Sequence, residues 1–192
     1  MKRGMNNVGL LALACVVVYG TLAFLMGALP GIVLSRTEPT AGLLPFTPAQ
    51  QRGRAVYVSE GCAYCHSQVV RPFAQDRVFG RPSVAGDYAY DTPELLGDHR
   101  NGPDLTNIGN RQPSDVWQYI HLYDPRALVS GSIMPSYPWL FRTEAAALAG
   151  QTVVHLPPGF EPKSGLVIPT REGRDLVSYL LSLKQVPLQN AK

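Results

Sequence analysis

The sequence is poor in the residues that build most metal clusters and catalytic sites. Its 192 residues include 3 cysteines and 4 histidines, and only one pair of cysteines is close together. Charged residues account for 16% of the chain, the net charge is +3, and no run of Lys or Arg occurs after residue 3. Nucleic-acid binding is therefore not expected. No internal repeat occurs, and the length suits one globular domain beside any membrane segment.

The cysteine pair lies in Cys62-Ala63-Tyr64-Cys65-His66, which has the C-x-x-C-H spacing of covalent haem attachment. Two thiols about one helical turn apart can each add to a haem vinyl group, and the imidazole of His66 then reaches one axial face of the iron. A thioredoxin-like disulfide or half of a zinc site would use the same cysteines. Both are disfavoured because no second pair exists and Cys15 lies in an apolar run. The motif predicts one haem c and a role in electron transfer.

Charge is absent between Arg3 and Arg36, and residues 8–29 are almost purely apolar. This stretch is long enough to cross a bilayer as one helix. A cleaved signal peptide usually has a shorter apolar region and an A-x-A-like site, which is not evident after Leu29. A lipoprotein site at Cys15 is a further alternative, but the apolar run continues beyond it. We expect a retained membrane anchor.

Charges beside the span predict its orientation. Lys2 and Arg3 precede it, whereas Arg36 after it is offset by Glu38. The positive-inside rule places the N-terminus in the cytoplasm. We therefore expect a single-pass protein of the bacterial inner membrane with its haem domain in the periplasm, the compartment in which bacteria attach haem to C-x-x-C-H sites.

Composition divides the chain into three expected segments. Residues 1–35 form the anchor. Residues 36–46 contain Pro39, Pro45 and little hydrophobic periodicity, so they are typical of a stiff linker. Residues 47–192 are expected to form one haem domain.

The pattern of the domain predicts an all-α, cytochrome c-like fold. Thr47 has the position of an N-cap, with Pro48 first in the helix and Gln50 completing a capping box. A second helix is expected over residues 114–123, and a terminal helix from about Thr170.

Apolar spacing predicts how these helices pack. Gly53 has no side chain, so the terminal helix can approach the first helix there and place Tyr179 against it. The residues expected to face inward are Val116, Trp117 and Ile120 of the middle helix and Leu176, Tyr179, Leu180 and Leu183 of the terminal helix.

His66 leaves one axial position of the iron open, and the candidates for it are Met134, His99, His121, His155 or no residue. We favour Met134 because the other three methionines belong to the anchor end of the chain. It lies in the strap Ser132-Ile133-Met134-Pro135-Ser136-Tyr137-Pro138, whose prolines restrict the backbone. A thioether ligand favours ferrous iron and raises the reduction potential.

Three further residues are candidates for the haem environment. The carbonyl of Pro103 could accept the Nδ1 hydrogen of the ligand His66 and fix the plane of its ring, although an ordinary turn is the alternative. Arg71 and Arg111 could neutralise the haem propionates, with a solvated surface position as the alternative for each.

Taken together, these motifs resemble the mono-haem, membrane-anchored cytochrome c subunit of cbb3-type haem-copper oxidases, the CcoO/FixO family. The resemblance covers most of the chain and rests on residues 61–68, 71–73, 83–86, 102–105 and 134–140.

The resemblance implies a subunit of the respiratory chain that docks on a catalytic haem-copper oxidase subunit, with a second cytochrome c subunit as a further partner and a soluble protein as electron donor. It implies that His66 and Met134 are the axial pair and that Pro103 is the histidine's acceptor. Trp117 and His121 match the family's Trp-x-x-x-His helix, which implies that His121 is a residue of the haem environment and not a ligand.

Some features depart from the family. Arg81-Pro82 stands where the family commonly has His-Tyr, and residues 151–169 resemble two short strands around Pro157-Pro158-Gly159. The alternatives are the anchored cytochrome subunit of a nitric oxide reductase-like complex and a haem-based peroxidase or gas sensor. The chain lacks the histidine-rich apolar helices of a haem-copper centre, so we expect no oxygen reduction by this chain alone.

Overall fold

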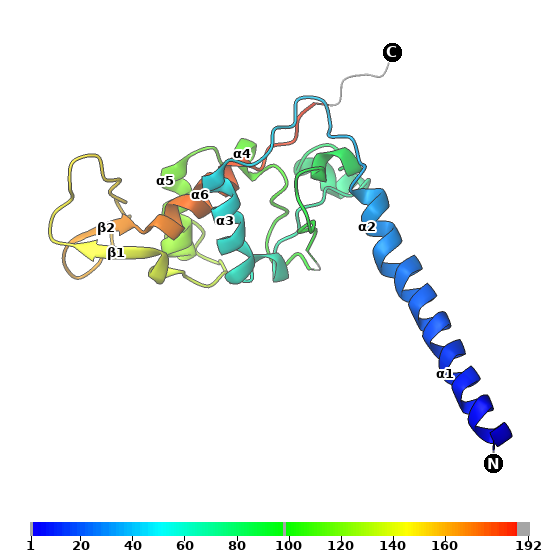
Figure 1. Ribbon diagram of the computed structural model, residues 1–192. Coiled ribbons are helices and arrows are strands. Elements are labelled where there is room, and N and C mark those ends of the chain that lie inside the picture. The colour runs from blue at the N-terminus through cyan, green and yellow to red at the C-terminus, as the bar shows by residue number, and fades with distance from the viewer. Residues whose placement is uncertain (1, 98, 188–192) are drawn as a thin grey trace.

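The computed structural model describes residues 2–97 and 99–187, so residues 188–192 of the predicted haem domain lie outside the described residues. A long N-terminal helix projects from one end of a globular domain (Figure 1). This helix is continuous through α1 (Lys2–Ala23), the π-helical turn η1 (Phe24–Ala28) and α2 (Leu29–Leu34). Pro30 lies two residues after the π-helical turn and has no N–H for the carbonyl four residues earlier, within that turn, which accounts for the irregularity.

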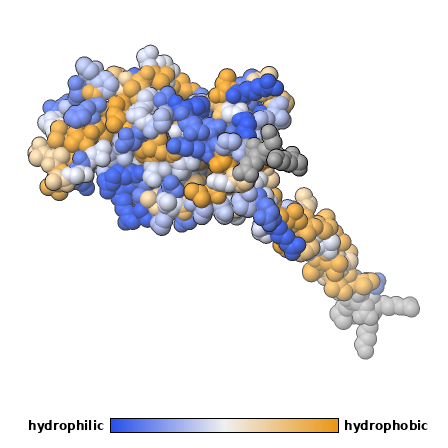
Figure 2. Space-filling view, turned by 90° about the horizontal axis from the view of Figure 1, so that it is seen from above, coloured by the Kyte–Doolittle hydropathy of each residue, from blue (hydrophilic) through white to orange (hydrophobic). Residues whose placement is uncertain are grey.

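The exposed surface of this helix is apolar. The segment Asn7–Leu34 has a mean hydropathy of 2.4, and none of it is buried against the domain. Figure 2 shows the apolar surface along the projecting helix. A helix that is apolar on all sides and has no protein partner is stable in lipid and not in water.

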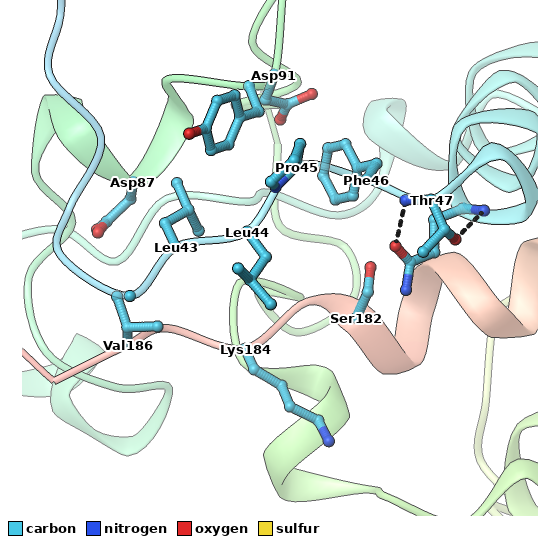
Figure 3. A pocket seen from close by; sticks show the side chains of 13 residues that line it. Leu43, Leu44, Pro45, Phe46, Thr47, Asp87, Asp91, Ser182, Lys184 and Val186 are labelled. Atoms are coloured by element: carbon cyan, nitrogen blue, oxygen red, sulfur yellow. Dashed lines mark hydrogen bonds between the residues drawn. The ribbon is translucent and has the colours of Figure 1, made fainter.

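The predicted linker lies against the domain. Thr40 donates its N–H to Gly86 O at 3.0 Å and its hydroxyl to Asp87 at 2.9 Å. Farther along, Phe46 packs edge-on against Tyr179, with ring centroids 5.5 Å apart. Leu43 to Phe46 pass along a cavity of about 290 Å³ (Figure 3), whose lining includes none of the predicted haem residues.

Two helices at opposite ends of the domain sequence pack together, as expected. The first, α3 (Pro48–Ser59), begins at the predicted capping box, in which Thr47 N donates to Gln50 Oε1 at 2.8 Å (Figure 3). The second, α6 (Arg171–Ser182), is capped by Thr170. A Cβ at Gly53 would lie only 2.8 Å from the Cβ of Tyr179 and would overlap the backbone of α6. The close approach predicted at Gly53 is therefore confirmed.

The middle helices are α4 (Ile108–Arg111) and α5 (Asp115–Tyr123). Ile120 is buried as expected, but Val116 is 45% exposed, and its predicted inward position is wrong. The helix packs against both α6 and the strap that carries Met134, where Tyr137 N donates to Leu122 O at 2.9 Å. Its buried face is therefore centred on residues 118–122.

A small sheet qualifies the all-α expectation, although the domain is mostly helical. Strands β1 (Phe141–Glu144) and β2 (Leu166–Pro169) are antiparallel, with Phe141 opposite Pro169. Of the two short strands suggested within residues 151–169, the structure has one, β2, whose partner is β1; Val154 forms only an isolated bridge to Val167. The β1 sequence Phe-Arg-Thr-Glu has one apolar residue and no apolar alternation, so it has no strand signal.

The other segments of the domain are loops with short 3-10 turns. These turns are η2 (Cys62–Tyr64), η3 (Ala74–Val78), η4 (Ala85–Tyr88), η5 (Pro125–Ala127) and η6 (Pro138–Leu140). One hydrophobic core joins α3, α5, α6 and the sheet, and Cys62 and Met134 pack at its margin.

Candidate haem site

The C-x-x-C-H segment follows α3 directly and forms one tight turn. Gly61 has φ +72°, which ends the helix and starts η2. The N–H groups of Cys65 and His66 both donate to Cys62 O, at 3.2 and 3.0 Å. The two cysteines are free thiols on this one turn. Burial raises the pKa of the Cys62 thiol to about 12, so the thiol is neutral against the core.

The imidazole of His66 is held by residues 102 and 103. Its Nδ1 lies 2.8 Å from Pro103 O. A carbonyl can only accept, so Nδ1 carries the hydrogen and Nε2 keeps the lone pair that a metal requires. Burial also lowers the pKa of His66 and thus favours the neutral ring. A Cβ at Gly102 would lie 2.7 Å from Nδ1, so only glycine lets the ring lie over this backbone.

A buried carboxylate joins the two segments that hold this ring. Asp104 is fully buried and accepts hydrogen bonds from Ser67 Oγ at 2.7 Å, Val69 N at 2.8 Å and Thr106 N at 2.9 Å. Backbone hydrogen bonds from Gly102 N to Cys65 O and from Leu105 N to Ser67 O run beside it. Residues 65–67 and 102–105 therefore form one unit around His66.

Arg71 lies in a neighbouring ion-pair network. Its Nε donates to Asp76 at 3.0 Å, its guanidinium lies over the Phe73 ring, and its side chain is 46% exposed. Asp76 is buried and also binds Arg100 at 2.7 Å, and Arg100 in turn donates to Ser67 Oγ at 2.6 Å. Arg71 is thus engaged with Asp76, and its predicted contact with a propionate stays a prediction. Arg100 is a residue that the sequence motifs did not indicate.

Arg111 is bound to the segment that holds the imidazole. Its guanidinium lies over the Phe79 ring at 5.2 Å and donates to Asp104 O, and its positive charge contributes to the lowered pKa of His66. Its Nε is buried and has no hydrogen-bond partner among the described residues. A buried guanidinium nitrogen without an acceptor suits a carboxylate that the protein itself does not supply.

Met134 lies in a strap with its own internal supports. It is half-buried and packs against the hydrophobic core. Arg126 donates to Met134 O at 3.1 Å and to Ser136 Oγ at 2.5 Å, and Met134 N donates to Ser132 Oγ at 3.2 Å. The strap is thus bound to η5 as well as restricted by its prolines. Arg126 has no motif of its own, so sequence reasoning missed this support.

The other three histidines differ in their surroundings. His99 and His155 are exposed. His121 is half-buried on α5, and its ring stacks on Trp117 with centroids 4.6 Å apart and planes 15° apart. No group of three or more His, Cys, Asp or Glu side chains is arranged for a metal ion within residues 2–97 and 99–187. The cysteine pair therefore has no zinc-ligand partners there.

These features fit a covalent haem. Two free thiols lie on one turn beside a neutral imidazole with a free Nε2, and a thioether lies at the margin of the same core. Arg111 Nε is one of several buried polar atoms without a partner in the described part of the chain, and its guanidinium, which donates to Asp104 O, suits a carboxylate of a haem.

Comparison with known proteins agrees with this geometry. No curated protein matches the sequence. Residues 4–155 match the family described as cytochrome c oxidase, mono-haem subunit/FixO, which is well over half of the chain. Of the alternatives that the sequence left open, this match supports the oxidase subunit. The chain belongs to the FixO family: it is the membrane-anchored, mono-haem cytochrome c subunit of a cbb3-type oxidase and transfers electrons to the catalytic subunit through one covalent haem c.

Proposed function

We propose that Cys62 and Cys65 attach the haem and that His66 and Met134 are its axial ligands. The observation that carries this proposal is the contact between His66 Nδ1 and Pro103 O, because it leaves Nε2 free beside both thiols. When bound, the haem supplies a one-electron Fe(III)/Fe(II) couple.

The surrounding residues keep this site rigid. Pro103 sets the plane of the imidazole, and Asp104 ties the C-x-x-C-H turn to residues 102–105. Arg126 holds the strap of Met134 from its main-chain side. A site that changes shape little between oxidation states suits electron transfer, because little reorganisation then accompanies each transfer.

The partners and the orientation follow from the same proposal. The N-terminus lies in the cytoplasm of a bacterium and the haem domain in the periplasm. The positive charges of Lys2 and Arg3 before the uncharged helix support this orientation. A soluble protein donates the electron, and a catalytic subunit with haem b and copper accepts it. A second cytochrome c subunit is a further partner. Holding the relay by an anchor raises its effective concentration beside the acceptor.

Purification of the full-length chain from native membranes in mild detergent tests this proposal. We expect one covalent haem on this chain and co-purification with a multi-span subunit that contains haem b and copper, identified by haem typing and metal analysis. Recovery of the chain as a lone monomer, together with normal oxidase activity in cells that lack it, would contradict the proposal.

A further inference from the structure

The membrane helix passes into the haem domain with almost no free chain between them. The turn that ends α2 continues to Thr37, whose N–H donates to a carbonyl of the helix at 2.9 Å. The first hydrogen bond to the domain is donated by Thr40 N to Gly86 O at 3.0 Å. Only two residues lie between Thr37 and Thr40, and one of them, Pro39, has a fixed φ. A Cβ at Gly86 would lie 2.8 Å from Glu38 O, so this junction is in close contact with the domain.

Arg81 joins three segments beside this junction. Its guanidinium donates to the two carboxylate oxygens of Asp87 at 2.8 and 2.5 Å, and to Val186 O at 3.1 and 3.0 Å. Asp87 in turn accepts the hydroxyl of Thr40 at 2.9 Å. The side chains of Arg81 and Asp87 are 20% and 7% exposed, so the ion pair is largely shielded from water. A forked guanidinium fixes the direction of its partners, because both of its N–H groups must be aligned at once.

The same network reaches the segment that holds the proposed iron ligand. Gln185 Nε2 donates to Arg81 O at 3.0 Å. Gln185 is also bound twice to Asn107: its N–H donates to Asn107 Oδ1 at 2.7 Å, and Asn107 Nδ2 donates to Gln185 Oε1 at 2.8 Å. Asn107 lies just after residues 102–105, which hold the imidazole of His66. Hydrogen bonds and short pieces of chain therefore connect the end of the membrane helix to the proposed haem site.

Apolar packing does not replace these polar contacts. Leu43 of the linker and Val186 of the C-terminal segment line the cavity of about 290 Å³, together with Asp87 (Figure 3). Side chains that face a cavity lack partner atoms on that side, so they hold the linker less firmly than a filled core does. The position of the linker on the domain therefore depends on the contacts of Arg81, Asp87 and Thr40.

We propose that Arg81 is a positioning residue that fixes the haem domain relative to its membrane anchor, through Asp87 and Thr40 on the linker side and Val186 on the C-terminal side. Arg81-Pro82 is also a departure from the family pattern to which the haem site gives no role. The inference rests on the proposed function and deepens it. An anchor at a fixed angle holds the relay in one orientation towards its acceptor, whereas a flexible tether only keeps it nearby.

Distances between two nitroxide labels on the full-length, haem-loaded chain in lipid nanodiscs test this inference. Cys15 on the exposed surface of the membrane helix is one label site, since Cys62 and Cys65 are occupied by the haem. Glu172→Cys, at an exposed position at the start of α6, is the other. The rate of electron transfer from this haem to the catalytic subunit and the reduction potential are measured without labels in the purified complex.

Two variants remove the contacts of the network from opposite sides. Arg81→Gln removes the forked guanidinium, and Thr40→Val removes the hydroxyl that binds Asp87. Thr40→Ser keeps that hydroxyl and is the conservative counterpart. Arg77→Gln, at an exposed arginine of η3, is the matched control.

We expect one narrow distance peak for the wild type, Thr40→Ser and Arg77→Gln, and loss of this peak in Arg81→Gln and Thr40→Val. Electron transfer to the catalytic subunit should be slower by about tenfold in Arg81→Gln, because a fixed donor geometry contributes to the rate. The reduction potential and the covalent haem should be unchanged. A residue that only stabilised the fold would not change the distance peak of a folded, haem-loaded chain.

A narrow peak in both Arg81→Gln and Thr40→Val would overturn the inference, and so would electron transfer at the wild-type rate in Arg81→Gln. If neither variant accumulates, the wild type decides, because a broad distribution of distances in the wild type shows that the anchor is not fixed. Each of these results leaves the proposed function intact. A wild-type chain without covalent haem would instead contradict the proposed function.

Discussion

The hydroxyl of Ser67 donates to the carboxylate of Asp104 at 2.7 Å, and both residues are buried. This bond joins the residue after the predicted iron ligand to the residue after its carbonyl acceptor. The orientation of His66 therefore depends on two segments that are far apart in sequence, and the pairing of these segments depends on one carboxylate.

Asp104→Asn should destabilise the haem domain by about 2–4 kcal/mol. Both carboxylate oxygens accept from N–H or O–H donors, so an amide NH2 would face a donor and leave it unpaired in the interior. Chemical unfolding followed by haem absorbance measures the change. The control Asp115→Asn, at an exposed position at the start of α5, should cost less than about 1 kcal/mol. Equal losses for the two variants would contradict this role of Asp104.

Asp76 should make the stability of the domain depend on pH in the acidic range. Hydrogen bonds from Arg71 and then Arg100 hold the pKa of Asp76 well below its usual value. A carboxyl with a lowered folded-state pKa stabilises the protein above its unfolded pKa of about 4, and this contribution is lost as the pH falls from there towards the folded value.

Asp76→Asn should therefore be less stable than the wild type at neutral pH, and its stability should fall less between about pH 5 and about pH 3. Unfolding midpoints measured over this range in both proteins test the prediction. Parallel pH profiles would show that Asp76 titrates at its ordinary pKa in the folded chain.

The double substitution Cys62→Ala with Cys65→Ala should abolish covalent haem, because these are the two thiols on the C-x-x-C-H turn. Haem staining after denaturing electrophoresis measures attachment. Cys15→Ala is the matched control and should stain normally, since Cys15 lies in the membrane helix. Staining that survives the double substitution would refute the assignment of the attachment site.

Met134→His should keep the iron low-spin but lower the reduction potential strongly, since imidazole stabilises ferric iron better than a thioether does. Redox titration of the purified complex measures the potential. Met134→Leu serves as the companion variant, and it should produce iron that lacks a sixth protein ligand and binds carbon monoxide rapidly when reduced. A potential that is the same in the wild type and Met134→His would exclude Met134 as a ligand.

Gly53→Ala should destabilise the domain by about 1–3 kcal/mol, because the added methyl group would overlap the backbone of α6 and the Cβ of Tyr179. Thermal unfolding measures the loss. Gly131→Ala is a suitable control, since no atom lies within 4 Å of the position of its Cβ. Equal melting temperatures for Gly53→Ala and the wild type would show that the two helices can separate without cost.

The elements that the sequence predicted well depend on neighbouring residues. The box of Thr47 and Gln50, the cap at Thr170 and the tight turn at Cys62 to His66 each use groups at most four residues apart. The uncharged span is equally local, because its length alone matches a bilayer. Gly53 was also predictable, since a glycine on an apolar helix face permits a close contact wherever the partner lies.

The remaining features depend on residues that only the fold brings together. Strand β1 has no apolar alternation and becomes a strand only because β2 lies beside it. The buried face of α5 is set by neighbours on two sides, so Val116 faces outward despite its apolar side chain. Arg100 meets Asp76 from 24 residues away, and Ser67 meets Asp104 from 37. The sequence by itself therefore determined the haem-attachment turn and the anchor. The tertiary structure decided how the turn is held, because a buried charge or hydroxyl pairs with the group that the fold places beside it, whatever their spacing in the sequence.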